Sequence, residues 1–84
     1  MFDVNKKLVK NILYYFVEIF GERLQELRVG KGYTQTVLAQ KFDVSVDTLR
    51  HWEHGRSVPH ITILIALAEH FKVTVGQLVG TEEL

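Results

Sequence analysis

The chain has no cysteine, a single proline and no excess of charge of either sign, and each absence excludes a class of protein. Without cysteine there can be neither a disulfide framework nor a thiolate zinc site. No apolar run approaches the length of a membrane span. Three lysines precede an apolar run near the N-terminus, but no small-residue cleavage site follows it, so we expect no signal peptide. We therefore expect a cytoplasmic protein with no membrane partner.

The length of 84 residues allows one domain with a modest core but not two. A hydrophobic content of 46% and a charged content of 24% are ordinary for a soluble globular protein. The net charge of zero is unusual for a nucleic-acid binder, because phosphate neutralisation supplies most of the non-specific affinity. A role on nucleic acid would therefore need a local basic face, and dimerisation would matter more.

No catalytic set can be assembled from these residues. The sequence has no Ser-His-Asp arrangement, no phosphate-cradling glycine loop and no paired carboxylates that would share a cleft. His51 and His54 lie close together, but no cysteine or well-placed carboxylate completes a zinc site. We expect no enzyme activity, no cofactor, no metal and no small-molecule ligand.

The most informative stretch runs from Gln35 to Gly55 and contains two short helical patterns separated by a brief break. Leu38 and Phe42 share one face before the break, and Leu49 and Trp52 share one face after it. Val44 lies in the break and can fill the space between the two helices, and the small Ala39 allows them to cross closely. Two helices in such a steep crossing form a helix-turn-helix, whose second helix can enter the DNA major groove.

Capping residues delimit further helices on both sides of this stretch. Gly30 and Gly32 suit the end of a helix over residues 21–28, and Gly55 ends the helix after the break. Thr34 and Ser45 are expected N-caps. A helix over residues 61–71 is apolar nearly all round, which predicts that it is buried. Its expected buried face comprises Ile61, Leu64, Ile65, Ala68 and Phe71, with Leu67 widening it. Residues 74–77 form a capping box that starts a last short helix, and residues 81–84 are expected to be a frayed tail.

The first 18 residues leave two interpretations open. Apolar residues recur at intervals of three and four over residues 9–20, which predicts an amphipathic helix with Asn5 as its N-cap. Residues 14–20 are also β-prone and could pair as a strand. Nearly half of the aromatic residues lie in this short segment. It is either an extra helix that covers the core or a dimerisation surface, because an exposed aromatic patch would otherwise promote aggregation.

Over residues 19–80 the chain resembles the lambda-repressor-like (Cro/XRE) helix-turn-helix family. The matching segments are FGERLQELRVGKGYTQ, VLAQKFDVS, TLRHWEHGRSVP and ILIALAEHFKVTVGQLVG. The resemblance implies an all-α, five-helix DNA-binding domain at residues 19–80, with residues 1–18 as an N-terminal extension. It also implies a transcriptional regulator that binds double-stranded DNA, commonly as a homodimer on a palindromic operator.

The resemblance also assigns roles to individual positions. It implies a structural ion pair between Arg28 and Glu53. Gln35 would contact a phosphate, and Arg50 projects outward with a guanidinium that can bind guanine or phosphate. Asp47 could accept a hydrogen bond from cytosine, or serve only as a helix-dipole partner and a surface partner of Arg50. The residues expected to bind DNA are Gln35, Ser45, Val46, Asp47, Thr48, Arg50, His51, His54 and Arg56.

Four positions depart from the family pattern. Asp43 stands where glycine is usual in the turn, and an aspartate tolerates the left-handed conformation at a higher cost. His60 replaces the usual serine or aspartate cap, which predicts a weakly capped helix at residue 61. Val46 and Asp47 replace long amides at base-reading positions. The alternative function is therefore a protein-interaction or antitoxin-type module, with weak DNA binding, on the same scaffold.

Overall fold

The computed structural model describes residues 4–84 and contains five helices over that range, as predicted. These are α1 (Val4–Gly30), α2 (Gln35–Lys41), α3 (Val46–Glu53), α4 (Ile61–Phe71) and α5 (Val75–Val79). The fold is therefore all-α across the described residues. The first three residues of the expected N-terminal extension lie outside the described part of the chain.

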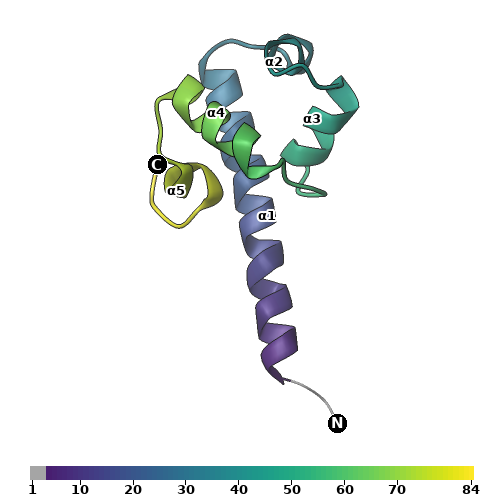
Figure 1. The fold of residues 1–84 in the computed structure, drawn as a ribbon, viewed down its shortest axis with the longest axis vertical. Helices are drawn as coiled ribbons and strands as arrows, with labels where there is room; N and C mark the ends of the chain where they lie inside the picture. The colour runs from purple at the N-terminus through teal and green to yellow at the C-terminus, as the bar shows by residue number, and fades with distance from the viewer. Residues whose placement is uncertain (1–3) are drawn as a thin grey trace.

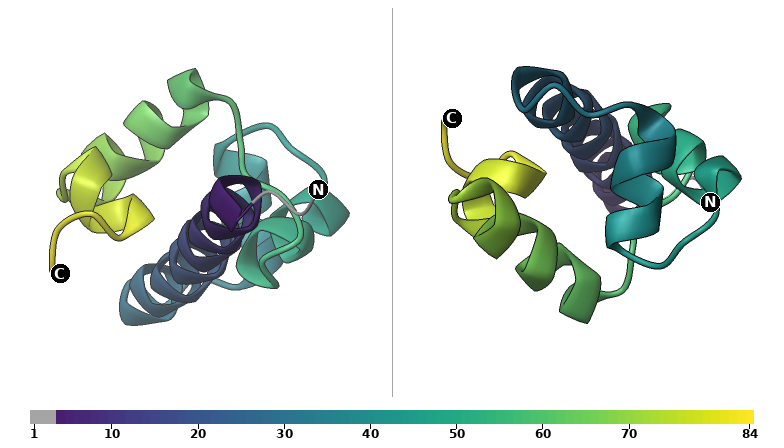
Figure 2. Two further views of the ribbon diagram at one scale, coloured as in Figure 1. Left: turned by 90° about the horizontal axis from the view of Figure 1, so that it is seen from below. Right: turned by 90° about the horizontal axis from the view of Figure 1, so that it is seen from above.

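Helix α1 is a single element of 27 residues that joins the N-terminal extension to the helix-turn-helix domain without a break. Its C-terminal half lies between the α2–α3 pair and the α4–α5 pair, and its N-terminal half projects from this body as a stalk (Figures 1 and 2). The projection explains the elongated dimensions of 48 × 26 × 20 Å. The helical interpretation of residues 14–20 is confirmed over the strand, and Asn5 lies inside the helix rather than at its cap.

The core lies entirely in the body and receives side chains from all five helices. Phe20 and Leu24 enter from α1, and both are fully buried. The complete buried cluster is Phe20, Leu24, Leu38, Ala39, Leu49, Trp52, Leu67, Ala68, Phe71 and Leu78. No residue of the stalk before Phe20 belongs to it.

The prediction for α4 is only partly confirmed. Its bounds match the predicted residues 61–71, and Leu67, Ala68 and Phe71 are buried. Ile61 and Ile65 were expected in the core but are 51% and 45% exposed. These two residues are four apart and share a face, which points away from the body because α4 forms its outer edge. The apolar composition of α4 therefore predicts more buried side chains than the structure contains.

Most helix ends follow the expected capping residues, and the end of α4 is an exception. The Thr74–Gln77 capping box is present, and Gly80 ends α5 in the left-handed conformation. Lys72 takes the same conformation after α4, at φ 57°, although no signal for it is visible in the sequence. Residues of the C-terminal tail, which was expected to fray, form hydrogen bonds with the first turn of α5. The Glu82 carboxylate accepts a hydrogen bond from Thr74 at 3.1 Å, and the Gln77 amide donates to the Glu83 carbonyl at 3.1 Å.

Candidate nucleic-acid interface

The two helices of the predicted motif are held at their N-termini by side-chain caps. Thr34 accepts a hydrogen bond from the Val37 amide, and Ser45 accepts one from the Thr48 amide, each at 3.1 Å. Both caps were predicted, and each satisfies a backbone donor that the first helical turn leaves without a partner. The positions of α2 and α3 along the chain are thus defined by local sequence.

The turn between α2 and α3 depends on Asp43, which adopts φ 54°. This left-handed conformation was expected at Asp43, and aspartate is one of the few non-glycine residues that adopts it readily. After the turn, the Val44 amide donates to the Ala39 carbonyl at 3.0 Å and closes the end of α2. Ala39 is buried beneath the crossing, as the spacing predicted.

A buried ion pair connects α1 to the end of α3. Arg28 donates from Nε to Oε2 of Glu53 at 2.6 Å and from Nη2 to Oε1 at 3.1 Å. The Nη1 group of Arg28 also donates to the Tyr33 carbonyl at 2.8 Å. Arg28 and Glu53 are 8% and 5% exposed, so each charge is largely removed from water and depends on its partner. No buried polar side-chain atom in residues 5–84 lacks a partner.

Hydrogen bonds lead from this ion pair to the exposed surface of α3. The Gln35 amide donates to Oε1 of Glu53 at 3.1 Å, and its carbonyl accepts a hydrogen bond from Arg50 Nε at 3.3 Å. Arg50 also pairs with Asp47 at 3.2 Å. Gln35 therefore ties the exposed arginine to a buried anchor, and Asp47 holds its other side.

The residues expected to bind DNA lie on one continuous part of the molecule, formed by the start of α2, by α3 and by the loop after it. Those on its exposed surface are Ser45, Asp47, Arg50, His51, His54 and Arg56. Gln35, Val46 and Thr48 are only half-exposed. Val46, which was expected to bind DNA, also packs in part against the core. Ser45 and Thr48 hydroxyls lie 2.9 Å apart, so each already has a partner.

The charge on this surface is mixed. Exposed cations surround it at Lys31, Lys41, Arg50 and Arg56, while Asp43 and Asp47 place exposed carboxylates among them. This surface is therefore not strongly basic, which is consistent with the zero net charge of the chain. Contact with phosphates would rest on a few cations, which predicts modest affinity for one copy.

Two contributions to the site were not expected from the sequence. A methyl group at Gly21 would lie 2.5 Å from the Trp52 carbonyl oxygen and 2.7 Å from that of Glu53, so only glycine lets α1 approach the end of α3 this closely. The sequence feature that could have indicated this contact is the glycine itself, because a glycine inside a predicted helix often marks close packing. His60 does cap α4, accepting a hydrogen bond from the Thr62 amide at 3.3 Å.

Two features are absent from the described residues, a group of metal-ligating side chains and a membrane-spanning helix. Among residues 4–84, no three histidine, cysteine or acidic side chains are grouped so as to hold a metal ion. No helix in this range is both long enough and apolar enough to cross a membrane.

A capped α2, a tight turn, a buried anchor and an α3 with an exposed polar face define a helix-turn-helix protein. The family model described as helix-turn-helix matches residues 24–78, which is more than half of the chain. The chain belongs to the Cro/C1-type helix-turn-helix family of transcriptional regulators.

Curated relatives carry names of the same kind. The chain is 40% identical over 65 residues to the HTH-type transcriptional activator BcrR of Enterococcus faecalis, covering 77% of this chain and 32% of that protein. It is 42% identical over 57 residues to the putative HTH-type transcriptional regulatory protein PF1851 of Pyrococcus furiosus, covering 68% of this chain and 18% of that protein.

A shorter relative matches over nearly its whole length. The chain is 32% identical over 66 residues to the uncharacterized HTH-type transcriptional regulator YazB of Bacillus subtilis, covering 79% of this chain and 96% of that protein. By contrast, the chain spans about a third or less of the two relatives described above. No solved structure matches the chain significantly.

Proposed function

We propose that the protein is a sequence-specific DNA-binding regulator that acts as a homodimer on a palindromic operator, with α3 in the major groove. The observation that carries this proposal is the division of α3 into two faces. Leu49, Trp52 and Glu53 are buried, whereas Asp47, Arg50 and His51 are exposed on the opposite side. A helix anchored in this way can present its polar face to base edges as a rigid unit.

Arg50 is the residue best placed to read a base. Its Nε and Nη1 groups donate to Gln35 and Asp47, so the guanidinium is held in one orientation before any DNA arrives. A guanidinium that is already oriented loses less side-chain entropy on binding guanine or phosphate. Because Asp47 pairs with Arg50, its function in the proposal is to orient the arginine rather than to read cytosine.

Binding to the phosphate backbone would come from exposed cations around the motif. Lys31, Lys41 and Arg56 are exposed and surround α2 and α3. With so few cations per copy, two copies on half-sites about 34 Å apart would be needed for firm binding at physiological salt.

Selection from random DNA duplexes at two salt concentrations tests the proposal directly. We expect a palindromic motif with half-sites separated by about one helical turn. Arg50→Ala should relax the selected motif, because it removes a base contact. Arg56→Ala is the matched control: it should weaken binding to all sequences about equally and reduce the salt dependence. If no motif emerges and all binding is lost well below physiological salt, the proposed DNA function is wrong.

A protein-interaction or antitoxin-type module is the second candidate, and one observation favours it. Six large apolar or aromatic side chains on the stalk of α1 are more than half exposed, and such a surface usually binds protein. This alternative requires no phosphate contact. A selection experiment without any motif, together with specific binding to a protein partner, would support it instead.

A further inference from the structure

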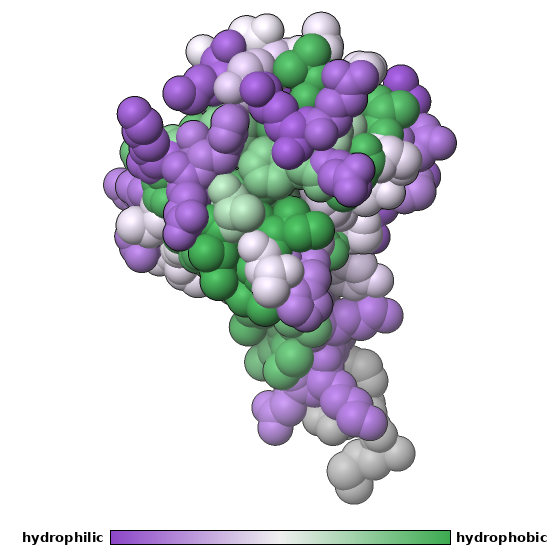
Figure 3. Space-filling model, turned by 45° about the horizontal axis from the view of Figure 1, so that its top comes forward, coloured by the Kyte–Doolittle hydropathy of each residue, from purple (hydrophilic) through white to green (hydrophobic). Residues whose placement is uncertain are grey.

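The stalk of α1 carries a row of exposed apolar side chains, which we call the α1 stripe: Leu8, Val9, Ile12, Leu13 and Tyr15. Each is between 53% and 61% exposed. Helical geometry places these five residues along one side of the stalk. Figure 3 shows hydrophobic surface continuing from the body onto the stalk. Leaving so much apolar surface in water is unfavourable, so the stripe requires a partner.

The spacing within the stripe is that of a helix that packs on another helix. Val9, Ile12, Phe16 and Ile19 follow one another at intervals of three, four and three, which is the pattern of a helix–helix seam. The Tyr15 ring packs edge-on against the Phe16 ring, with centroids 5.3 Å apart, and so joins the stripe to this seam.

Within the chain, α5 covers only the C-terminal end of the seam. A methyl group at Gly80 would lie 2.6 Å from a methyl carbon of Ile19, so the end of α5 sits directly on the seam. Arg23 then donates to the Gln77 carbonyl at 2.5 Å and fixes α1 to α5 on the same side. Over residues 8–12 of α1, no described element lies where α5 lies beside Ile19. The uncovered part thus continues a face that already accepts a helix.

The area of the stripe fits a second copy of the same helix. Each of the five side chains is more than half exposed, and two facing stripes with a polar rim would bury about 1,200 Å² in total. That total is the lower bound for specific, stable protein interfaces. A twofold axis requires a self-complementary patch, and an apolar face that runs along one helix meets this requirement.

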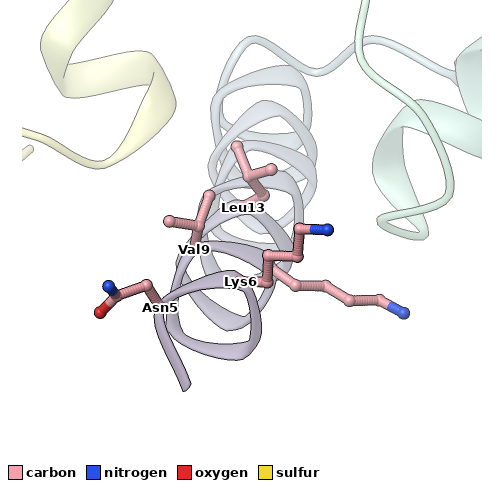
Figure 4. Close-up of a pocket in the computed structure, with 5 residues that line it drawn as sticks. Asn5, Lys6, Val9 and Leu13 are labelled. Carbon is pink, nitrogen blue, oxygen red and sulfur yellow. The ribbon is translucent and has the colours of Figure 1, made fainter. Parts of the chain in front are cut away.

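The edge of the stripe has the composition of an interface rim. Val9 and Leu13 lie beside an open hollow on the stalk, which Asn5, Lys6 and Lys10 also line (Figure 4). Lysine stems can cover apolar surface at the edge of a contact while their charged groups stay in water. The hollow is suited to receive an apolar side chain from the facing helix.

We propose that the α1 stripe is the surface through which two copies of this chain associate, helix against helix. The assignment rests on the homodimer of the proposed function and names the surface that forms it. The exposed face of α4 is the competing surface, but it offers only Ile61 and Ile65, with less apolar area than the five-residue stripe.

Sedimentation equilibrium on the full chain tests this assignment with matched variants. Val9→Gln/Ile12→Gln introduces two polar helix-forming residues at the centre of the stripe, and Tyr14→Gln is the control. Tyr14 is as exposed as Tyr15, at 57% against 56%, but it lies on a different side of the helix beneath Lys10, 5.8 Å from its ring centre. Because all three positions are more than half exposed, the fold should survive, which circular dichroism would verify.

We expect the wild type and Tyr14→Gln to be dimers and the double variant to dissociate at least about tenfold more readily. A monomeric wild type at the highest soluble concentration would overturn the assignment. So would an Ile65→Gln chain that becomes monomeric while the double variant stays dimeric. If the wild type stays monomeric and cosediments with anionic lipid vesicles, the stripe binds a membrane surface, and the assignment is equally wrong.

The same variants separate this inference from the proposed DNA function. If only the dimer surface is wrong, the double variant should still select the full palindrome. If only DNA reading is wrong, the wild type should be dimeric and select no motif. When both are right, the double variant should retain the half-site preference and lose the fixed spacing, whereas Arg50→Ala should stay dimeric and lose the motif.

Discussion

The C-terminal half of α1, from Phe20 to Arg28, is enclosed by other helices, whereas its N-terminal half keeps the side chains of the α1 stripe more than half exposed. Both halves repeat apolar residues at intervals of three and four. In the C-terminal half, Phe20 and Leu24 are fully buried against the body. The same periodicity therefore has different consequences in the two halves, depending on whether another helix is present to cover it.

This difference shows that helical periodicity specifies a face rather than a degree of burial. An amphipathic pattern states which side chains share one side of a helix. Burial requires a second element, and the neighbours of the C-terminal half come from residues 35–80, far along the chain. Matched substitutions in the two halves can therefore measure what the neighbours contribute.

The largest expected contrast concerns charged residues. Arg28→Ala would leave the Glu53 carboxylate buried without its partner, which should lower the free energy of unfolding by about 3–5 kcal/mol. At concentrations where the chain is monomeric, Lys10→Ala in the stalk removes only an exposed contact over Tyr14 and should change the free energy of unfolding by less than about 0.5 kcal/mol. Urea denaturation would measure both. A loss below about 1 kcal/mol for Arg28→Ala would contradict the structural role of the pair.

Two leucines provide the next contrast. Leu24 is fully buried and Leu13 is 61% exposed, although both lie on α1. Leu24→Ala should cost about 3 kcal/mol through lost burial and the cavity that remains. At concentrations where the chain is monomeric, Leu13→Ala should cost less than about 0.5 kcal/mol. Thermal or urea unfolding at low concentration would compare them, and equal losses would show that the stalk is covered within one chain.

Two glycines of α1 give the smallest contrast, and their substitutions are expected to change the free energy of unfolding in opposite directions. Gly21→Ala would push a methyl group against the Trp52 and Glu53 carbonyls, which are backbone atoms of α3, and should cost about 1–3 kcal/mol. Gly30 has open space around it, so Gly30→Ala should raise the free energy of unfolding by about 0.5 kcal/mol through helix propensity. If both variants are stabilised, the close contact of α1 with α3 is not as tight as the structure indicates.

Much of the fold could be predicted because its determinants lie within a few residues of one another. The Thr34 and Ser45 caps, the left-handed Asp43 and the Thr74–Gln77 capping box each depend on side chains that reach backbone groups nearby in the chain. The bounds of α4 also follow from local pattern.

The failures share a different cause. Ile61 and Ile65 were expected in the core but are exposed, and Val46, expected to bind DNA, packs in part against the core. Each error concerns how much of a helix its distant neighbours cover. The hydrogen bonds that join Gln35 to Glu53 and Arg50 to Gln35 were also not predicted, because they connect residues 18 and 15 positions apart.

The sequence alone determined helices α2 to α5, the Thr34, Ser45 and Thr74 caps, the tight turn and the residues that could form a polar face on α3, because these depend on short-range sterics and hydrogen bonding. Only the tertiary structure decided that Gly21 lets α1 meet α3, that Gln35 ties Arg50 to a buried anchor, and that the α1 stripe remains uncovered. Those outcomes depend on how closely elements distant in sequence approach one another, and local sequence patterns do not specify that approach.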